Sequence, residues 1–194
     1  MQTSDLFVVG IASSAGGLSP MIELLENASC HKNMCFVIVS HIDRFRESAI
    51  AKIVKQVSRL STQVIVDGLE LEHCGIYVIP PNQYVYLEGL RFRLMVRPTG
   101  GPNNCADFFF ESLAKNFGAN AIGVVLSGAA VGADGSKGIE AIKRVGGHTY
   151  AQDPQLAEFE DMPKLAIQTG SIDSVMTASQ IGHELSLVSW GASL

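Results

Sequence analysis

Residues 6–17 read LFVVGIASSAGG and change character halfway along. The first half is apolar and rich in β-branched residues, which is typical of a buried strand. The second half holds only small residues, and a helical pattern begins at Leu18. The segment therefore predicts a strand, a tight turn and a helix, with the hydroxyls of Ser13 and Ser14 in the turn. Such a turn can present a serine nucleophile, cradle a phosphate or cap the helix.

Apolar runs alternate with helical patterns along the rest of the chain. Residues 35–39 (CFVIV) are apolar throughout, as in strands that are buried on both faces of a parallel sheet. The pattern predicts an α/β fold, a doubly wound and mostly parallel sheet with helices on both faces and an antiparallel hairpin of residues 84–87 and 91–96. The other strands are expected at residues 6–10, 34–40, 63–66, 75–79, 121–127, 148–152 and 171–176, and the helices at 18–26, 47–57, 105–117, 137–145, 163–169 and 177–188.

Length and composition limit the kinds of protein that this chain can be. Its 194 residues suit a single domain over 1–194, and the net charge of −5 gives no reason to expect a nucleic-acid partner. The sequence has no signal-peptide pattern and no apolar run of about 18 residues, so we expect a cytoplasmic protein that is not inserted in a membrane. The four cysteines lack CxxC spacing, which predicts free thiols in a reducing compartment and no metal site.

Three residues with catalytic chemistry fall at or just beyond the ends of predicted strands: Ser14, His41 and Asp134. A serine needs a base within hydrogen-bond reach, and the base needs a third group to orient it. In a doubly wound sheet, ligands bind at the carboxyl ends of the strands, at a topological switch point. Each residue also has a structural interpretation: Ser14 as a helix cap, His41 as a buried structural group, and Asp134 as a cap or an Asx-turn. Four other histidines are expected to be structural or solvent-facing: His31, His73, His148 and His183.

The glycine-rich turn does not match the known nucleotide-binding patterns. Gly10, Gly16 and Gly17 do not have the G-x-G-x-x-G spacing, and the Gly-Lys-Ser/Thr ending of a P-loop is missing. We therefore expect no nucleotide and no other cofactor.

Several motifs in the same order resemble the catalytic domain of the CheB-type chemotaxis protein-glutamate methylesterases. The resemblance covers nearly the whole chain, from about residue 6 to residue 185. The matching segments are Ser14-Ala15-Gly16-Gly17, residues 37–41 (VIVSH), residues 76–82 (IYVIPPN), residues 122–128 (IGVVLSG) with Asp134-Gly135, residues 151–154 (AQDP) and Met162-Pro163-Lys164.

This resemblance implies a serine hydrolase with a Ser14–His41–Asp134 triad. Ser14 would attack the γ-methyl ester of a chemoreceptor glutamate, His41 would carry the proton, and Asp134 would orient His41. The backbone N–H of Ala15 would help to form the oxyanion hole. Family members also deamidate receptor glutamines and need no cofactor or metal. They commonly carry a receiver domain or are joined to a methyltransferase. Residues 1–194 show neither, which leaves two interpretations open: an excised domain of a larger chain that includes one of these partners, or a stand-alone divergent member.

The sequence departs from the family pattern at three places. Ala12-Ser13 replaces Gly-Ala before the nucleophile, Ser40 replaces a glutamine before His41, and the loop of residues 128–135 is two residues longer than usual. The altered loop leaves two alternatives open. One is a catalytically weak or inactive member that binds receptors or signalling proteins. The other is a small-ligand module, or a hydrolase of a different ester or amide.

Overall fold

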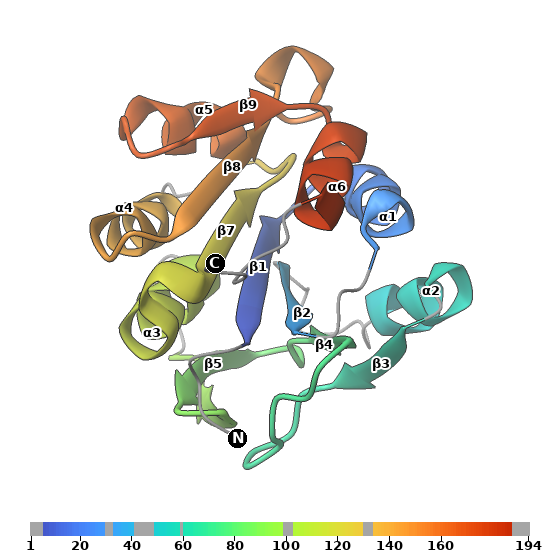
Figure 1. Cartoon of the computed structure of the whole chain (residues 1–194), viewed down its shortest axis with the longest axis vertical. Helices are drawn as coiled ribbons and strands as arrows, with labels where there is room; N and C mark the ends of the chain where they lie inside the picture. The colour runs from blue at the N-terminus through green and yellow to red at the C-terminus, as the bar shows by residue number, and fades with distance from the viewer. Residues whose placement is uncertain are drawn as a thin grey trace, which may run out of the picture.

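The computed structural model describes residues 6–29, 33–40, 49–58, 60–98, 103–129 and 134–187. A seven-stranded parallel sheet forms the centre, with the strand order β3-β4-β2-β1-β7-β8-β9 (Figure 1). Its strands are β1 (Phe7–Ser13), β2 (Met34–Ser40), β3 (Ser61–Val64), β4 (Gly75–Val78), β7 (Ala121–Val125), β8 (His148–Gln152) and β9 (Ser174–Met176). Strands β5 (Gln83–Glu88) and β6 (Arg91–Val96) form a separate antiparallel hairpin.

Two hydrophobic cores lie on opposite faces of the sheet. In β1 every residue is buried, and successive side chains alternate between the two cores, Val8 into one and Val9 into the other. The first core is closed by the hairpin and by α3 (Cys105–Phe117), α4 (Ser136–Arg144) and α5 (Asp161–Gln168). The second is closed by α1 (Leu18–Asn27), α2 (Ala49–Val57) and α6 (Ala178–Leu187). Short 3₁₀ turns occupy Gly118–Asn120 and Pro154–Leu156.

This arrangement confirms the predicted fold class, including helices on both faces and the hairpin. The predicted bounds of β2, β8 and α3 agree with the structure, whereas β1 continues three residues further than expected, to Ser13. It does so because Ile11 and Ala12 still pair with both β2 and β7, and Ser13 still pairs with β2. Strand β9 is shorter than predicted, and within the described residues no helix has the length and apolarity to span a membrane.

The chain changes direction across the sheet between β1 and β7. From β1 it moves to β2 through α1, and later returns to the other side of β1 at β7. Helices α1 and α4, which follow β1 and β7, cover opposite faces of the sheet (Figure 1). The carboxyl ends of β1 and β7 therefore flank the topological switch point, where doubly wound folds bind ligands.

Candidate functional site

The turn after β1 buries one of its two serines and leaves the other accessible. Ser13 is 2% exposed and lies opposite Ser40 in the β1–β2 pair, whereas Ser14 is half-buried. The Ser14 N–H donates to the carbonyl of Ser127 (3.0 Å), and the Ser14 carbonyl accepts from the N–H of Gly17 (3.0 Å). The N-cap of α1 is Gly17, without a side-chain hydrogen bond, so neither serine caps the helix. The backbone thus fixes Ser14 at the switch point with its side chain partly open to solvent.

The small residues after Ser14 are required by close packing. Gly16 has a φ of 69°, and a Cβ there would lie 2.7 Å from the Cβ of Glu158. Ala15, the expected oxyanion donor, is exposed, and its carbonyl accepts a hydrogen bond from the Ser127 hydroxyl (3.1 Å). The turn therefore needs glycine at position 16 both for its backbone conformation and for space.

The segment after β7 lies against the serine turn. The fully buried hydroxyl of Ser127 accepts from the Phe159 N–H (3.0 Å), and so connects the turn to the segment before α5. Gly128 is held from both sides, because its N–H donates to the Phe159 carbonyl and its carbonyl accepts from the Met162 N–H (both 3.0 Å). A Cβ on Gly128 would lie 2.9 Å from the Cβ of Ser14. Position 128 is thus a direct neighbour of the candidate nucleophile.

Asp134 is buried, with an exposed fraction of 3%, and its carboxylate binds the N-terminus of α3. Oδ1 accepts from the N–H of Asp107 (2.8 Å), and Oδ2 accepts from the N–H of Ala106 (3.0 Å). The Cys105 thiol donates a longer contact to Oδ2 (3.7 Å). The cap interpretation of Asp134 therefore holds in part, although the helix it caps is α3 rather than the following α4. Helix N-termini favour negative charge, so this contact also stabilises the start of α3.

Asp107, which the sequence patterns did not single out, makes the reciprocal contact. Its Oδ1 accepts from the N–H groups of Gly135 (2.9 Å) and Gly138 (2.8 Å), at the N-terminus of α4. Burial raises the pKa of Asp107 to about 6, and the nearby charge of Asp134 also contributes to this increase. Burial, followed by the charge of Asp134, raises the pKa of the Cys105 thiol as well, so Cys105 stays protonated. The two helices thus exchange caps through a pair of carboxylates.

His41 and residues 130–133 lie outside the described residues. The last described residue before His41 is Ser40, which is 6% exposed and ends β2. Of the predicted site, the structure therefore places Ser14, Ala15 and Asp134.

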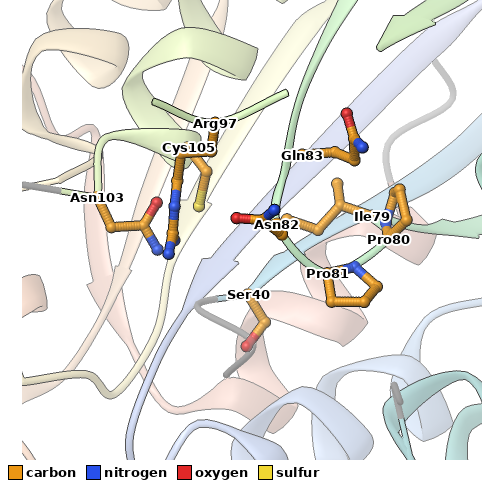
Figure 2. A pocket seen from close by; sticks show the side chains of 9 residues that line it. All are labelled: Ser40, Ile79, Pro80, Pro81, Asn82, Gln83, Arg97, Asn103 and Cys105. Atoms are coloured by element: carbon orange, nitrogen blue, oxygen red, sulfur yellow. The ribbon is translucent and has the colours of Figure 1, made fainter. Parts of the chain in front are cut away.

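A small polar pocket lies beside the end of β2, next to the strand that carries Ser14. Its volume is about 10 Å³, which is close to the room that one water needs. In Figure 2, Arg97, Asn103 and Cys105 lie on one side of the pocket and Asn82 lies on the other. The Oδ1 atoms of Asn82 and Asn103 are buried and have no hydrogen-bond partner among the described residues, which suits a bridging water. The complete lining is Ser40, Ile79, Pro80, Pro81, Asn82, Gln83, Arg97, Asn103 and Cys105.

Within the part of the chain that the structure describes, the remaining metal-ligating and redox-active side chains form no second candidate site. In the described ranges no three His, Cys, Asp or Glu residues lie close enough to hold a metal ion.

The expectation of free thiols throughout is wrong, because Cys74 is disulfide-bonded, while Cys35 and Cys105 are free and buried. Spacing did not reveal this bond, since a disulfide depends on the approach of two residues in the fold. His148 is half-buried, and burial lowers its pKa.

The fold and its switch-point turn define an α/β protein that presents a serine at the carboxyl edge of a parallel sheet. Comparison with known families gives a more specific assignment, because the model of the family described as CheB methylesterase matches residues 9–185. The chain belongs to the CheB methylesterase family.

Solved and curated relatives agree with this assignment. The crystal structure of the Thermotoga maritima CheB methylesterase catalytic domain superposes with a TM-score of 0.83 and 25% identity, over 93% of this chain and 97% of that one. Protein-glutamate methylesterase/protein-glutamine glutaminase 3 of Leptospira interrogans is 30% identical over 95% of this chain and 54% of its own length. Protein-glutamate methylesterase/protein-glutamine glutaminase 1 of Myxococcus xanthus is 30% identical over 92% of this chain and 52% of its own length. The chain thus spans about half the length of these curated relatives.

Proposed function

We propose that this domain is a serine hydrolase that removes methyl groups from glutamate γ-methyl esters of chemoreceptors. The observation that carries the proposal is the position of Ser14. It lies half-exposed at the switch point of a CheB-family fold, with its backbone fixed by Ser127 and Gly17. The relatives named as methylesterase/glutaminase extend the proposal to deamidation of receptor glutamines.

In the proposed mechanism, the Ser14 Oγ forms a bond to the γ-carbonyl carbon of the ester, and His41 accepts the serine proton. The tetrahedral oxyanion is stabilised by the backbone N–H of Ala15. Collapse of this intermediate breaks the bond to the methoxy oxygen, and His41 returns the proton so that methanol leaves. Water, deprotonated by His41, then attacks the acyl carbon, the bond to the Ser14 Oγ breaks, and His41 returns its proton to that oxygen as the glutamate carboxylate leaves. With a glutamine substrate, ammonia leaves instead of methanol.

The role assigned to Asp134 is to orient His41 and to stabilise its charged form. Its burial and its two backbone donors support this role, because a triad carboxylate must stay ionised in a fixed position. The reaction needs no cofactor. In agreement with the sequence-based expectation, we propose that the reaction takes place in the cytoplasm.

The test is methanol release from methylated receptor in membranes. The unmodified protein should release methanol, and Ser14→Ala should release it about 10⁴-fold more slowly or worse. Ser13→Ala is the matched control, because it removes a neighbouring hydroxyl that is buried, and it should retain activity. If the unmodified protein releases no methanol but binds receptor, the domain is a binding module and the hydrolase proposal is wrong. If it cleaves simple esters but ignores receptor, the receptor assignment is wrong.

A further inference from the structure

Two carboxylates, Asp107 on α3 and Asp134 before α4, hold the start of each other's helix. Asp134 accepts the N–H groups of Ala106 and Asp107, and Asp107 accepts those of Gly135 and Gly138. All four distances lie between 2.8 and 3.0 Å. Hydrogen bonds to a charged acceptor are about twice as strong as neutral ones. The pair therefore joins the two helix starts as one unit.

The two helices depend on this exchange, because neither has a cap of its own. The N-cap residue of α3 is Asn104 and that of α4 is Gly135, and neither makes a side-chain cap hydrogen bond. Gly135 also has a φ of 97°, so the chain turns sharply directly after Asp134. Asp107 binds the N–H of this turning residue, and the direction in which the Asp134 side chain leaves the backbone depends on that turn.

We propose that Asp107 is a positioning residue that fixes the Asp134–Gly135 turn and so keeps the Asp134 carboxylate aligned for the reaction. The inference rests on the proposed function of Asp134 as the group that orients the catalytic base. Asp107 itself touches neither the substrate nor the reacting atoms. It is 8% exposed and otherwise faces a hollow of about 200 Å³ that Tyr84, Glu111 and Lys137 also line.

The first test compares Asp107→Ala with Asp107→Asn. Alanine removes both acceptor bonds to the α4 turn, whereas the asparagine Oδ1 can still accept them. We expect Asp107→Ala to lower kcat for methanol release by about 10²-fold with little change in KM, since a shift of about 1 Å in a positioning contact has an effect of that size. Asp107→Asn should restore kcat to within a few-fold of the unmodified protein. Glu111→Gln removes one charge from the same helix without those bonds and should leave kcat unchanged.

A double mutant separates positioning from a general loss of structure. If Asp107 acts through Asp134, the variant Asp107→Ala/Asp134→Ala should be no slower than Asp134→Ala alone. Multiplicative effects in the double mutant would overturn the proposal, and so would an Asp107→Ala enzyme with the kcat of the unmodified protein.

Amide hydrogen exchange gives a readout that does not depend on activity. In Asp107→Ala the N–H groups of Gly135 and Gly138 lose their acceptor directly, and the backbone N–H groups of Ala106 and of the substituted residue should also exchange faster because Asp134 is no longer held. Faster exchange at Gly135 and Gly138 only would overturn the proposal, because Asp107 would then be a simple cap of α4. Should the unmodified protein release no methanol, the proposed function fails. The exchange at Ala106 still decides whether Asp107 positions Asp134, with faster exchange supporting it and unchanged exchange overturning it.

Discussion

Gly128→Ala adds one methyl group beside the proposed nucleophile and tests whether the placement of Ser14 matters. The new Cβ would lie 2.1 Å from the Met162 Sδ and 2.9 Å from the Ser14 Cβ. The backbone of Gly128 cannot easily retreat, because its N–H and its carbonyl are both bonded to the segment of Phe159 and Met162. The Met162 side chain is flexible and can move away. The Cβ of Ser14 is attached to the backbone of its turn and has less freedom.

The expected magnitudes follow from these distances. Carbon atoms in contact prefer a separation of about 3.5–4.0 Å, so Ser14 and the new methyl must separate by roughly 0.6–1 Å. A displacement of about 1 Å in a catalytic group costs up to about 10²-fold, so we expect kcat to fall by about 10- to 100-fold. Overpacking of a buried position typically destabilises a protein by about 1–3 kcal/mol, and we expect a loss in that range.

The assay measures methanol release for kcat and urea unfolding for stability. Gly123→Ala on β7 is the matched control, because its Cβ would meet the ends of Ile139 and Ile142 (2.8 and 2.9 Å) in the core, away from Ser14. Gly123→Ala should lower the free energy of unfolding by a similar amount to Gly128→Ala, but its kcat should equal that of the unmodified protein. A Gly128→Ala protein with the kcat of the unmodified enzyme, or equal losses of kcat in both variants, would refute the reasoning.

Three further predictions concern stability. Burial raises the pKa of Asp107 to about 6, so the contribution of this group to the free energy of unfolding should fall as pH rises from about 4 to about 6. The loss should be roughly 1–2 kcal/mol after allowing for solvent screening. Asp107→Asn should remove this pH dependence, as measured by urea titrations between pH 4 and pH 8. Burial would raise the pKa of Asp173, but hydrogen bonds from Lys143 and from the backbone outweigh burial, so the pKa is lowered. Asp173→Asn should therefore lower the free energy of unfolding by about 1 kcal/mol at pH 7 and by much less near pH 3. A loss of stability that does not depend on pH would contradict this assignment. Ser127→Ala removes the acceptor of the part-buried Phe159 N–H and should lower the free energy of unfolding by about 0.5–1.5 kcal/mol, measured by thermal unfolding; an unchanged free energy of unfolding would contradict this assignment.

The sequence was most informative for the central strands. Every residue of β1 and β2 is buried, so selection for apolar side chains on both faces leaves a clear continuous pattern. The edge strand β9 gives a weaker signal, because Val175 is 46% exposed and only three residues pair. The end of β1 was placed too early, since the small residues at 12 and 13 suggest a turn by composition but are held in the sheet by pairing with β2.

At the site, local patterns identified residue types but not their surroundings. The small-residue turn indicated Ser13 and Ser14 equally, and only the family resemblance selected Ser14; in the structure Ser14 is the more exposed of the two. Asp107 was missed because its partners are 28 and 31 residues away along the chain, and no helical or strand period relates them. The only local signal was an acidic residue in the first turn of α3, which is common at helix N-termini and indicates nothing about a second helix.

Two motifs that are far apart in the sequence form one structural unit at the carboxyl edge of the sheet. The turn after β1 and the segment after β7 lie more than 100 residues apart, yet Ser127 bonds the Ala15 carbonyl and a methyl on Gly128 would press against Ser14. These contacts exist because β1 and β7 are adjacent parallel strands whose carboxyl ends meet at one edge of the sheet. The space at residue 128 is therefore limited by Met162 and Ser14, which belong to two other segments of the chain. A larger residue at 128 should be tolerated only if both neighbours move aside, and a displacement of Ser14 removes the position on which the proposed reaction depends.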